Sequence, residues 1–217
     1  MASEKNNFKS KIAVSLRIVE ASNYKEKRDA LSHDWVEFFE KIGVFPLFVP
    51  NNIRDVEGFL TEMKVDGIIL SGGDNVGDDL DRDRTERELI QFSINSKTPL
   101  FGVCRGMQAI NKFFNGEVIV SKDRNHVSKT HSVKINNMNS KIMNNSNLSV
   151  NSFHNNLIFK EGIGKGLTTF AISKDDETVE GFFHKEYPIS GVMWHPEREQ
   201  NKENILIVKE FLKINDP

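Results

Sequence analysis

Apolar and polar positions alternate along the first half of the chain in a pattern that predicts strands and helices in turn. Apolar runs predict buried strands, and segments with apolar residues at helical spacing separate them. The predicted strands are Lys11–Val19, Val44–Pro50, Val65–Gly73 and Thr98–Cys104. The predicted helices are Asp34–Ile42, Asp55–Met63, Thr85–Asn95 and Arg105–Gly116. This alternation indicates an α/β fold with a largely parallel sheet covered by helices on both faces.

The second half of the chain has a different pattern, in which short strand-like segments follow one another. The predicted strands are Glu117–Val120, Ser132–Ile135, Thr168–Ser173, Val179–Phe183 and Ile189–Trp194. We expect some of them to pair antiparallel, and Lys202–Ile214 to close the chain as an amphipathic helix. The asparagine-rich stretch 136–147 predicts an exposed loop. Because no Pro/Gly/Ser-rich linker interrupts the 217 residues, we predict one three-layer domain over residues 1–217.

Composition and charge narrow the classes of function. The formal net charge is -2, which indicates no nucleic-acid-binding surface. A single cysteine excludes an intrachain disulfide and fits a reducing compartment. The polar residues 1–11 lack the apolar core of a secretory signal, and no apolar run reaches the roughly 20 residues that span a bilayer. We therefore expect a cytoplasmic protein without a membrane partner.

The segment GVCRGMQ carries the strongest chemical signal. Cys104 lies where an apolar strand runs into a helix, with Gly102 and Gly106 two residues to either side. A nucleophile on such a turn has a strained backbone and needs small neighbours. The N-terminus of the following helix favours a thiolate, and the backbone N–H of Arg105 would point at a developing oxyanion. Cys104 is therefore a candidate nucleophile.

The segment VMWHPER supplies a candidate base. It ends an apolar strand, so His195 should leave the sheet at its edge and face a cleft. Glu197 follows two residues later, where its carboxylate can accept a hydrogen bond from the imidazole and fix its tautomer. Cys104, His195 and Glu197 then form a set of nucleophile, base and orienting group.

Taken together, these motifs resemble the class I glutamine amidotransferase superfamily, and within it the γ-glutamyl hydrolase branch. The resemblance covers nearly the whole chain. SGGDN looks like the glycine turn of that branch, RDRTERELI like its RDxxExxLI helix start and GVCRGMQAIN like its nucleophile elbow. VNSFHN resembles its substrate-lining strand end, and GVMWHPE resembles its closing strand. The resemblance implies a flavodoxin-like α/β fold and a cysteine-dependent amide hydrolase without a cofactor.

The resemblance also implies a role for individual residues. Cys104 would attack the γ-carbonyl to give a glutamyl thioester, His195 would transfer the proton to the leaving amine, and Glu197 would orient His195. Gly73 and Arg105 would supply backbone N–H groups to the oxyanion hole. The glutamyl group would be held by Gln108 and by the backbone around Phe153, His154 and Asn155.

Basic residues near the end of the first predicted strand point to the leaving group. Arg17 ends that strand, at the carboxyl edge where open α/β sheets bind ligands, and Tyr24, Lys25 and Arg28 lie in the following loop. They form either a solvated loop or a clamp on an anionic leaving group, to which the side chain of Arg105, beside the candidate nucleophile, could contribute. Within its branch the chain is similar to bacterial hydrolases of γ-glutamyl-CDP-amidate in capsule phosphoramidate biosynthesis.

The sequence offers little support for a metal site. His126 and His131 are five residues apart, which puts them on opposite sides of a strand or loop. The aspartates at positions 78, 79, 81 and 83 lack the glycine of a calcium loop, so we predict a solvated acidic turn before a helix. We predict no metal ligands in this chain.

Three functions remain open. The first is a self-contained hydrolase of a γ-glutamyl amide, in which the leaving group is a nucleotide phosphoramidate, a polyamine or a polyglutamate. The second is the glutaminase subunit of a two-chain amidotransferase, which needs a separate synthase partner. The third is a non-catalytic binding module, against which Cys104, His195 and Glu197 argue. The motif RDxxE and the CRG form of the elbow favour the first.

Overall fold

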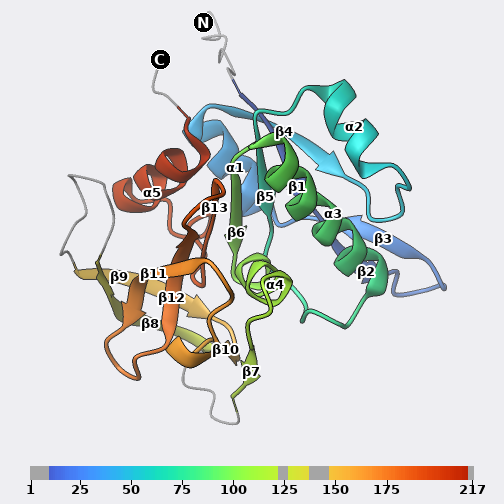
Figure 1. Ribbon diagram of the computed structural model, residues 1–217. Coiled ribbons are helices and arrows are strands. Elements are labelled where there is room, and N and C mark those ends of the chain that lie inside the picture. The colour runs from blue at the N-terminus through green and yellow to red at the C-terminus, as the bar shows by residue number, and fades with distance from the viewer. Residues whose placement is uncertain (1–9, 122–126, 137–146, 215–217) are drawn as a thin grey trace, which may run out of the picture.

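A mixed β-sheet runs through the middle of the protein (Figure 1). The computed structural model describes residues 10–121, 127–136 and 147–214. The strands of the main sheet are β1 (Ser10–Ser15), β4 (Val44–Val49), β5 (Gly67–Leu70), β6 (Leu100–Val103), β8 (Val127–Ile135), β9 (Asn147–Phe153), β11 (Leu167–Ser173), β12 (Val179–His184) and β13 (Ile189–Val192). Their order is β4-β1-β5-β6-β13-β12-β11-β8-β9.

The sheet has a parallel part and an antiparallel part, as the sequence predicts. Strands β4, β1, β5, β6 and β13 are parallel, whereas β13, β12, β11, β8 and β9 pair antiparallel. Strand β13 comes from the second half of the chain but lies beside β6, with Val192 opposite Val103. The carboxyl ends of β6 and β13 therefore meet at one edge of the sheet.

Helices cover both faces of the sheet and complete the three predicted layers (Figure 1). They are α1 (His33–Ile42), α2 (Val56–Met63), α3 (Leu80–Ser96), α4 (Arg105–Phe113) and α5 (Lys202–Leu212), with a short 3-10 turn at Lys160–Gly162. Ile12 and Val14 pack into the core under α1 and α5, and Ala13 packs into the core under α2, α3 and α4. The two faces follow from the alternation of side chains along a strand.

Helix α1 shows how the local sequence sets these elements. The side chain of Ser32 accepts a hydrogen bond from the Asp34 N–H and caps the first turn. Trp35, Phe38, Phe39 and Ile42 recur at helical spacing, and all four are buried against the sheet. The predicted helix therefore forms on the predicted face.

The first predicted strand is wrong in its second half. Strand β1 ends at Ser15, and Arg17 instead begins β2 (Arg17–Glu20), which pairs antiparallel with β3 (Lys27–Ala30). The charged residues of this hairpin are exposed or half-buried. They cannot enter the buried centre of a parallel sheet, so the chain leaves the sheet after Leu16 and forms a separate ribbon.

The helix predicted from Thr85 begins at Leu80 instead. Asp79 caps it by accepting hydrogen bonds from the N–H groups of Asp81 and Arg82. The first turn carries no buried apolar residue, since Leu80 is 80% exposed, so the apolar periodicity misses it. The predicted acidic turn is therefore partly helical, and the carboxylates of Asp78, Asp79 and Asp83 accept hydrogen bonds.

The remaining elements surround the edge of the sheet at which β6 and β13 end. Strands β7 (Ile119–Val120) and β10 (Asn156–Leu157) form a small antiparallel pair. The predicted loop 136–147 lies mostly outside the described residues. Among the helices that the structure describes, none combines the length and apolar character that a membrane crossing requires.

Candidate active site

Cys104 lies on a sharp turn between β6 and α4, as predicted. Its backbone angles are φ 51° and ψ -104°, which residues with a side chain rarely adopt. The Cys104 N–H donates to the carbonyl of Val192 on β13 at 2.8 Å, which holds the turn against the neighbouring strand. A Cβ atom on Gly106 would clash with the backbone of Leu70, so only glycine allows α4 to start this close to β5.

His195 and Glu197 follow β13 and are both buried. The Nδ1 atom of His195 lies 2.7 Å from Oε1 of Glu197, which leaves Nε2 for the hydrogen bond with the Cys104 side chain. Burial lowers the pKa of His195, but the hydrogen bonds and charges of Cys104 and Glu197 outweigh it and raise this pKa to about 9. The three side chains thus form one connected chain.

Asn151 on β9 holds the backbone of His195 from the antiparallel side. Its Nδ2 donates to the His195 carbonyl at 2.8 Å, and its Oδ1 accepts from the His195 N–H at 2.9 Å. Asn151 is 9% exposed. This paired contact fixes the segment that carries the imidazole, and it was not predicted from the sequence.

Gly73 and the backbone of Arg105 lie at neighbouring strand ends beside the cysteine. Gly73 follows β5 with φ 133°, which favours glycine, and a Cβ on Gly72 would lie 2.7 Å from Cε1 of His195. Arg105 is the first residue of α4, so its N–H has no acceptor within the helix. Both predicted oxyanion donors therefore belong to the segments around the thiol.

The side chain of Arg105 corrects one expectation. The sequence allowed it to assist with an anionic leaving group, but the guanidinium is 1% exposed and faces α3. It bonds to Asp83 at 2.6 Å and to Glu86. Two buried or half-buried carboxylates therefore neutralise this charge, and it is not available to a substrate.

Gln108 is joined to the predicted substrate-lining segment through Asn156, to which the sequence motifs assigned no role. Asn156 Nδ2 donates to Gln108 Oε1 and to Asn75 Oδ1, both at 2.9 Å. Asn155 Oδ1 is buried and meets no hydrogen-bond donor within the described part of the chain. The structure thus brings Gln108, Asn75 and the segment after β9 together.

The side chains of Phe153 and His154 point in different directions. Phe153 is 42% exposed and packs edge to face against His195, with ring centroids 5.8 Å apart. His154 is buried, with Nδ1 3.0 Å from the Asn156 carbonyl and Nε2 3.6 Å from Oε1 of Glu180. Phe153 therefore lines the space beside the imidazole, whereas the His154 ring faces β12.

The basic residues predicted to bind the leaving group do not lie together in the structure. Arg17 lies against the glycine turn, because a Cβ on Gly73 would meet Arg17 Cβ at 3.4 Å, and its Nη2 bonds to Asp74 at 2.8 Å. Arg28 lies opposite Val19, further along the hairpin, and bonds to Glu26 and to the Tyr24 hydroxyl. Within the described contacts, neither Tyr24 nor Arg28 touches the Cys104–His195–Glu197 chain.

No group of three metal-ligating side chains is present among the residues that the structure describes. The acidic residues before α3 are used in other ways: Asp79 pairs with Lys27 at 2.7 Å, and Asp78 binds the Asn75 backbone at 3.0 Å. His126 lies outside the described residues.

The fold and this arrangement agree with the family comparison. The family model for glutamine amidotransferase class-I matches residues 23–214. The chain therefore belongs to the class I glutamine amidotransferase family, and the resemblance drawn from the motifs is confirmed.

Individual relatives agree with this assignment. The chain is 33% identical over 210 residues to the gamma-glutamyl-CDP-amidate hydrolase of Campylobacter jejuni, covering 94% of this chain and 98% of the relative. It is 26% identical to anthranilate synthase component 2 of Saccharolobus solfataricus, covering 85% and 93%. A solved structure of a candidate GMP synthase subunit from Thermoplasma acidophilum matches with a TM-score of 0.71 at 25% identity, covering 95% and 94%.

Proposed function

We propose that this protein hydrolyses a γ-glutamyl amide through a glutamyl thioester on Cys104. The observation that carries the proposal is the buried chain of contacts from Cys104 through His195 to Glu197 at the ends of β6 and β13. Such a chain activates a thiol, because the imidazole takes its proton and the carboxylate stabilises the resulting imidazolium.

The reaction proceeds in two halves. At neutral pH the proton of the Cys104 thiol already lies on His195, whose pKa is raised to about 9. The Cys104 thiolate attacks the γ-carbonyl carbon, the carbon–nitrogen bond breaks as the tetrahedral intermediate collapses, and His195 gives its proton to the leaving nitrogen. The neutral His195 then deprotonates a water molecule, which attacks the thioester carbonyl and releases glutamate and the Cys104 thiolate, and the new carboxyl group loses its proton to solvent. His195 is protonated again at the end of the cycle.

Backbone and amide groups around the thiol supply the other roles. The N–H groups of Gly73 and Arg105 stabilise the negative oxygen of the intermediate. Gln108, Asn155 and the backbone beside Phe153 bind the α-amino and α-carboxylate groups of the glutamyl substrate. The buried Oδ1 of Asn155 supports this role, since a substrate ammonium would satisfy it.

The proposed substrate is γ-glutamyl-CDP-amidate, which yields glutamate and cytidine diphosphoramidate in capsule phosphoramidate biosynthesis. Two observations support this class of leaving group. A relative that the chain matches over nearly its whole length carries that activity in its name. In addition, Arg17 lies against Gly73, which in this proposal binds the oxygen of the scissile amide. A guanidinium suits a phosphate oxygen because it donates in a fixed planar fork.

Tyr24 and Arg28 take the distal part of the same substrate in this proposal. They lie on the outer half of the hairpin, and Arg28 lines a cavity of about 130 Å³ whose lining also includes Lys27 and the carboxylates of Asp29 and Asp81. Because Arg28 lies further along the hairpin from Gly73 than Arg17 does, its contribution should be smaller than that of Arg17.

The test is hydrolysis of γ-glutamyl-CDP-amidate by the purified protein alone. Arg17→Met should lower kcat/KM for this compound by roughly ten- to a hundredfold, since a charge-assisted hydrogen bond contributes about 1.5–3 kcal/mol. Arg28→Met should have the smaller effect. Neither change should alter hydrolysis of a neutral γ-glutamyl anilide, and Arg87→Met, at an exposed position of α3, is the control on both substrates. Equal losses on both compounds would assign Arg17 to the fold.

A second candidate function is the glutaminase subunit of a two-chain amidotransferase. The similarity to anthranilate synthase component 2 and to a candidate GMP synthase subunit favours it. A self-contained hydrolase should turn over its γ-glutamyl substrate with no other protein present and should process free glutamine poorly. Efficient glutamine hydrolysis that appears only after a synthase is added would decide for the amidotransferase. The cytoplasmic location stays a prediction.

A further inference from the structure

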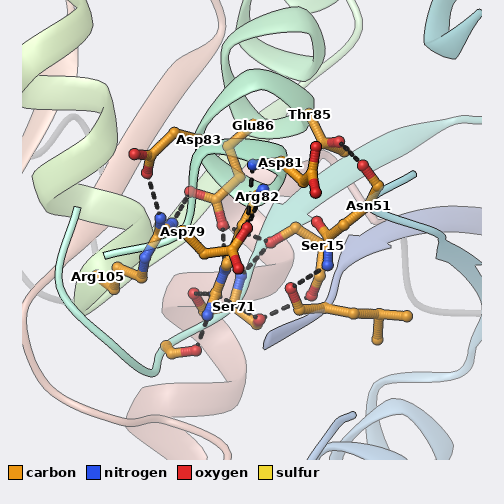
Figure 2. A network of polar contacts seen from close by, with 12 residues as sticks. Ser15, Asn51, Ser71, Asp79, Asp81, Arg82, Asp83, Thr85, Glu86 and Arg105 are labelled. Carbon is orange, nitrogen blue, oxygen red and sulfur yellow. Dashed lines mark hydrogen bonds and ion pairs between the residues drawn. The ribbon is translucent and has the colours of Figure 1, made fainter. Parts of the chain in front are cut away.

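A cluster of charged side chains joins α3 to the glycine turn that follows β5 and to the first residue of α4 (Figure 2). Arg82, Glu86 and Arg105 are each 1% exposed, and Asp83 completes the cluster. Two guanidinium and two carboxylate groups give it a formal charge of zero. Arg82 and Glu86 come from α3, whereas Arg105 comes from the start of α4. The catalytic steps proposed above use none of the four side chains.

Arg82 reaches the carbonyls of the glycine turn. Its Nη2 donates to the Ser71 carbonyl at 2.8 Å and to the Gly72 carbonyl at 3.0 Å, and its Nε donates to Glu86 at 3.0 Å. Figure 2 shows this guanidinium between α3 and the segment that follows β5. One side chain thus holds two consecutive peptide groups of the turn.

This contact determines the direction of the Gly73 N–H. The Gly72 carbonyl and the Gly73 N–H belong to one peptide group, and the described peptide bonds are trans. In a trans peptide the C=O and N–H bonds point in opposite directions. Because the carbonyl points at Arg82, the Gly73 N–H points away from it. The Arg105 peptide is held likewise, since the Cys104 carbonyl accepts from the Gln108 N–H at 3.1 Å.

Glu86 links the two donor segments. Its Oε1 accepts from Arg82 Nε and from the Ser15 hydroxyl, each at 3.0 Å, and its Oε2 accepts from Arg105. The same Ser15 hydroxyl accepts the Ser71 N–H at 3.0 Å. The carboxylate therefore joins the end of β1, the glycine turn and the first residue of α4, so that the two donors cannot shift independently.

Resting on the proposed function, we infer that Arg82, held by Glu86, is a positioning residue that aims the Gly73 N–H at the oxyanion. Stability alone is a weak reason for such a cluster, because replacing a buried ion network by apolar residues is often neutral or stabilising. Orientation of a hydrogen-bond donor needs a directional partner, which apolar side chains cannot provide.

The test distinguishes a loss of oxyanion stabilisation from a change in the reactivity of the Cys104 thiol. Arg82→Met should lower kcat for a γ-glutamyl anilide by about 100- to 1000-fold, the usual loss for one oxyanion donor, while KM changes by less than about threefold. Alkylation of Cys104 by iodoacetamide forms no oxyanion on a carbonyl carbon, so its rate should stay within about threefold of the wild type. Arg82→Lys should recover part of kcat, because one ammonium can reach a carbonyl.

Arg84→Met is the matched control, since Arg84 lies on the same helix and also binds a loop carbonyl, that of Asn51 at 3.0 Å. It should leave kcat unchanged. Unchanged kcat in Arg82→Met, or a parallel loss of kcat and alkylation rate, would overturn the inference. If Arg82→Met does not fold, Arg82→Lys and Glu86→Gln serve in the same assays.

A structural measurement keeps this inference apart from the proposed function. A wild type inactive on every γ-glutamyl compound would remove the proposed function. A crystal structure of Arg82→Met still tests the positioning role in that case. A Gly72–Gly73 peptide that has turned or lost its order supports the role of Arg82, and an unchanged peptide refutes it.

Discussion

The two sides of the candidate site are held in place by different chemistry. The turns at Cys104 and at Gly72–Gly73 are supported by charged side chains, namely Arg82, Arg105, Glu86 and Asp83. The segment with His195 and Glu197 is held by uncharged amides. Asn151 grips the His195 backbone, Gln200 donates to the Glu197 carbonyl at 2.9 Å, and Asn204 accepts from Trp194 at 2.9 Å.

The difference follows from what each side must do. The pKa of His195 depends on the charges near its ring, so an added formal charge would change its value of about 9. Amides fix the backbone there without adding charge. On the other side the groups to be fixed are backbone carbonyls, and a guanidinium can bind several of them at once. Position and charge are thus controlled separately on the two sides.

If the two sides of the site act in one reaction, removal of the proposed nucleophile by Cys104→Ala should have the largest effect on turnover. We expect a loss of at least about 10,000-fold in kcat for a γ-glutamyl anilide, because no other group can form the thioester. Iodoacetamide should inactivate the wild type with the label on Cys104 by mass spectrometry. Substantial turnover by Cys104→Ala would refute the mechanism.

Removal of the base should be nearly as damaging as removal of the nucleophile. His195→Asn should approach the loss of Cys104→Ala, and Glu197→Gln should be milder, because it keeps a hydrogen-bond acceptor for Nδ1. The groups act as a unit, so the double variant should be little worse than His195→Asn. Steady-state kinetics of the three variants would show additive losses if the two residues had separate roles.

The amide support should matter less than the charged one. Asn151→Ala removes the paired contact with the His195 backbone and should lower kcat/KM by roughly tenfold, since a neutral hydrogen bond contributes about 0.5–1.5 kcal/mol. Asn147→Ala, at an exposed position of the same strand, is the control. If Asn151→Ala lowered the activity as much as Arg82→Met does, the proposed difference between the two sides would be refuted.

The smallest effect concerns the titration of His195. Its imidazole should titrate near pH 9 by NMR, and Glu197→Gln should lower this midpoint by about one unit or more, because a negative charge beside the ring is lost. Asn151→Ala should leave it nearly unchanged. Since the folded pKa lies above 6.5, protonation stabilises the fold fully below pH 6.5, and this stabilisation disappears as the pH rises through 9.

Much of the fold and the central site could be predicted because their signals are local. The turn at Cys104 follows from an apolar strand, two glycines and a helix within a few residues. His195 and Glu197 follow from the end of the last strand in the same way. Their meeting depends on β13 lying beside β6, which the family resemblance implied and local periodicity did not.

The supports could not be predicted because they join distant segments. Arg82 and Glu86 belong to the RDxxExxLI motif and have the spacing of an ion pair on one helix face, but the helix predicted from apolar periodicity began at Thr85, and the motif assigned their side chains no role. The side chain of Arg105 was predicted to lie near the leaving group because it follows Cys104 in the sequence, whereas this long side chain extends to α3. Asn151 belongs to a motif that pointed to the substrate, and Asn156 follows that motif, but hydrogen bonds between polar side chains of distant segments leave no periodic signal in the sequence.

The strained turn at Cys104 has a consequence for how such a protein can evolve. A side chain at φ 51° and ψ -104° costs about 1–3 kcal/mol, and glycine avoids most of this cost. With Cys104 as the proposed nucleophile, selection for catalysis and selection for stability oppose each other at this position. A duplicate released from catalysis could become more stable by the single change Cys104→Gly and keep its pocket as a binding protein. The difference in thermal midpoint between Cys104→Gly and Cys104→Ala measures how strongly the fold favours that route.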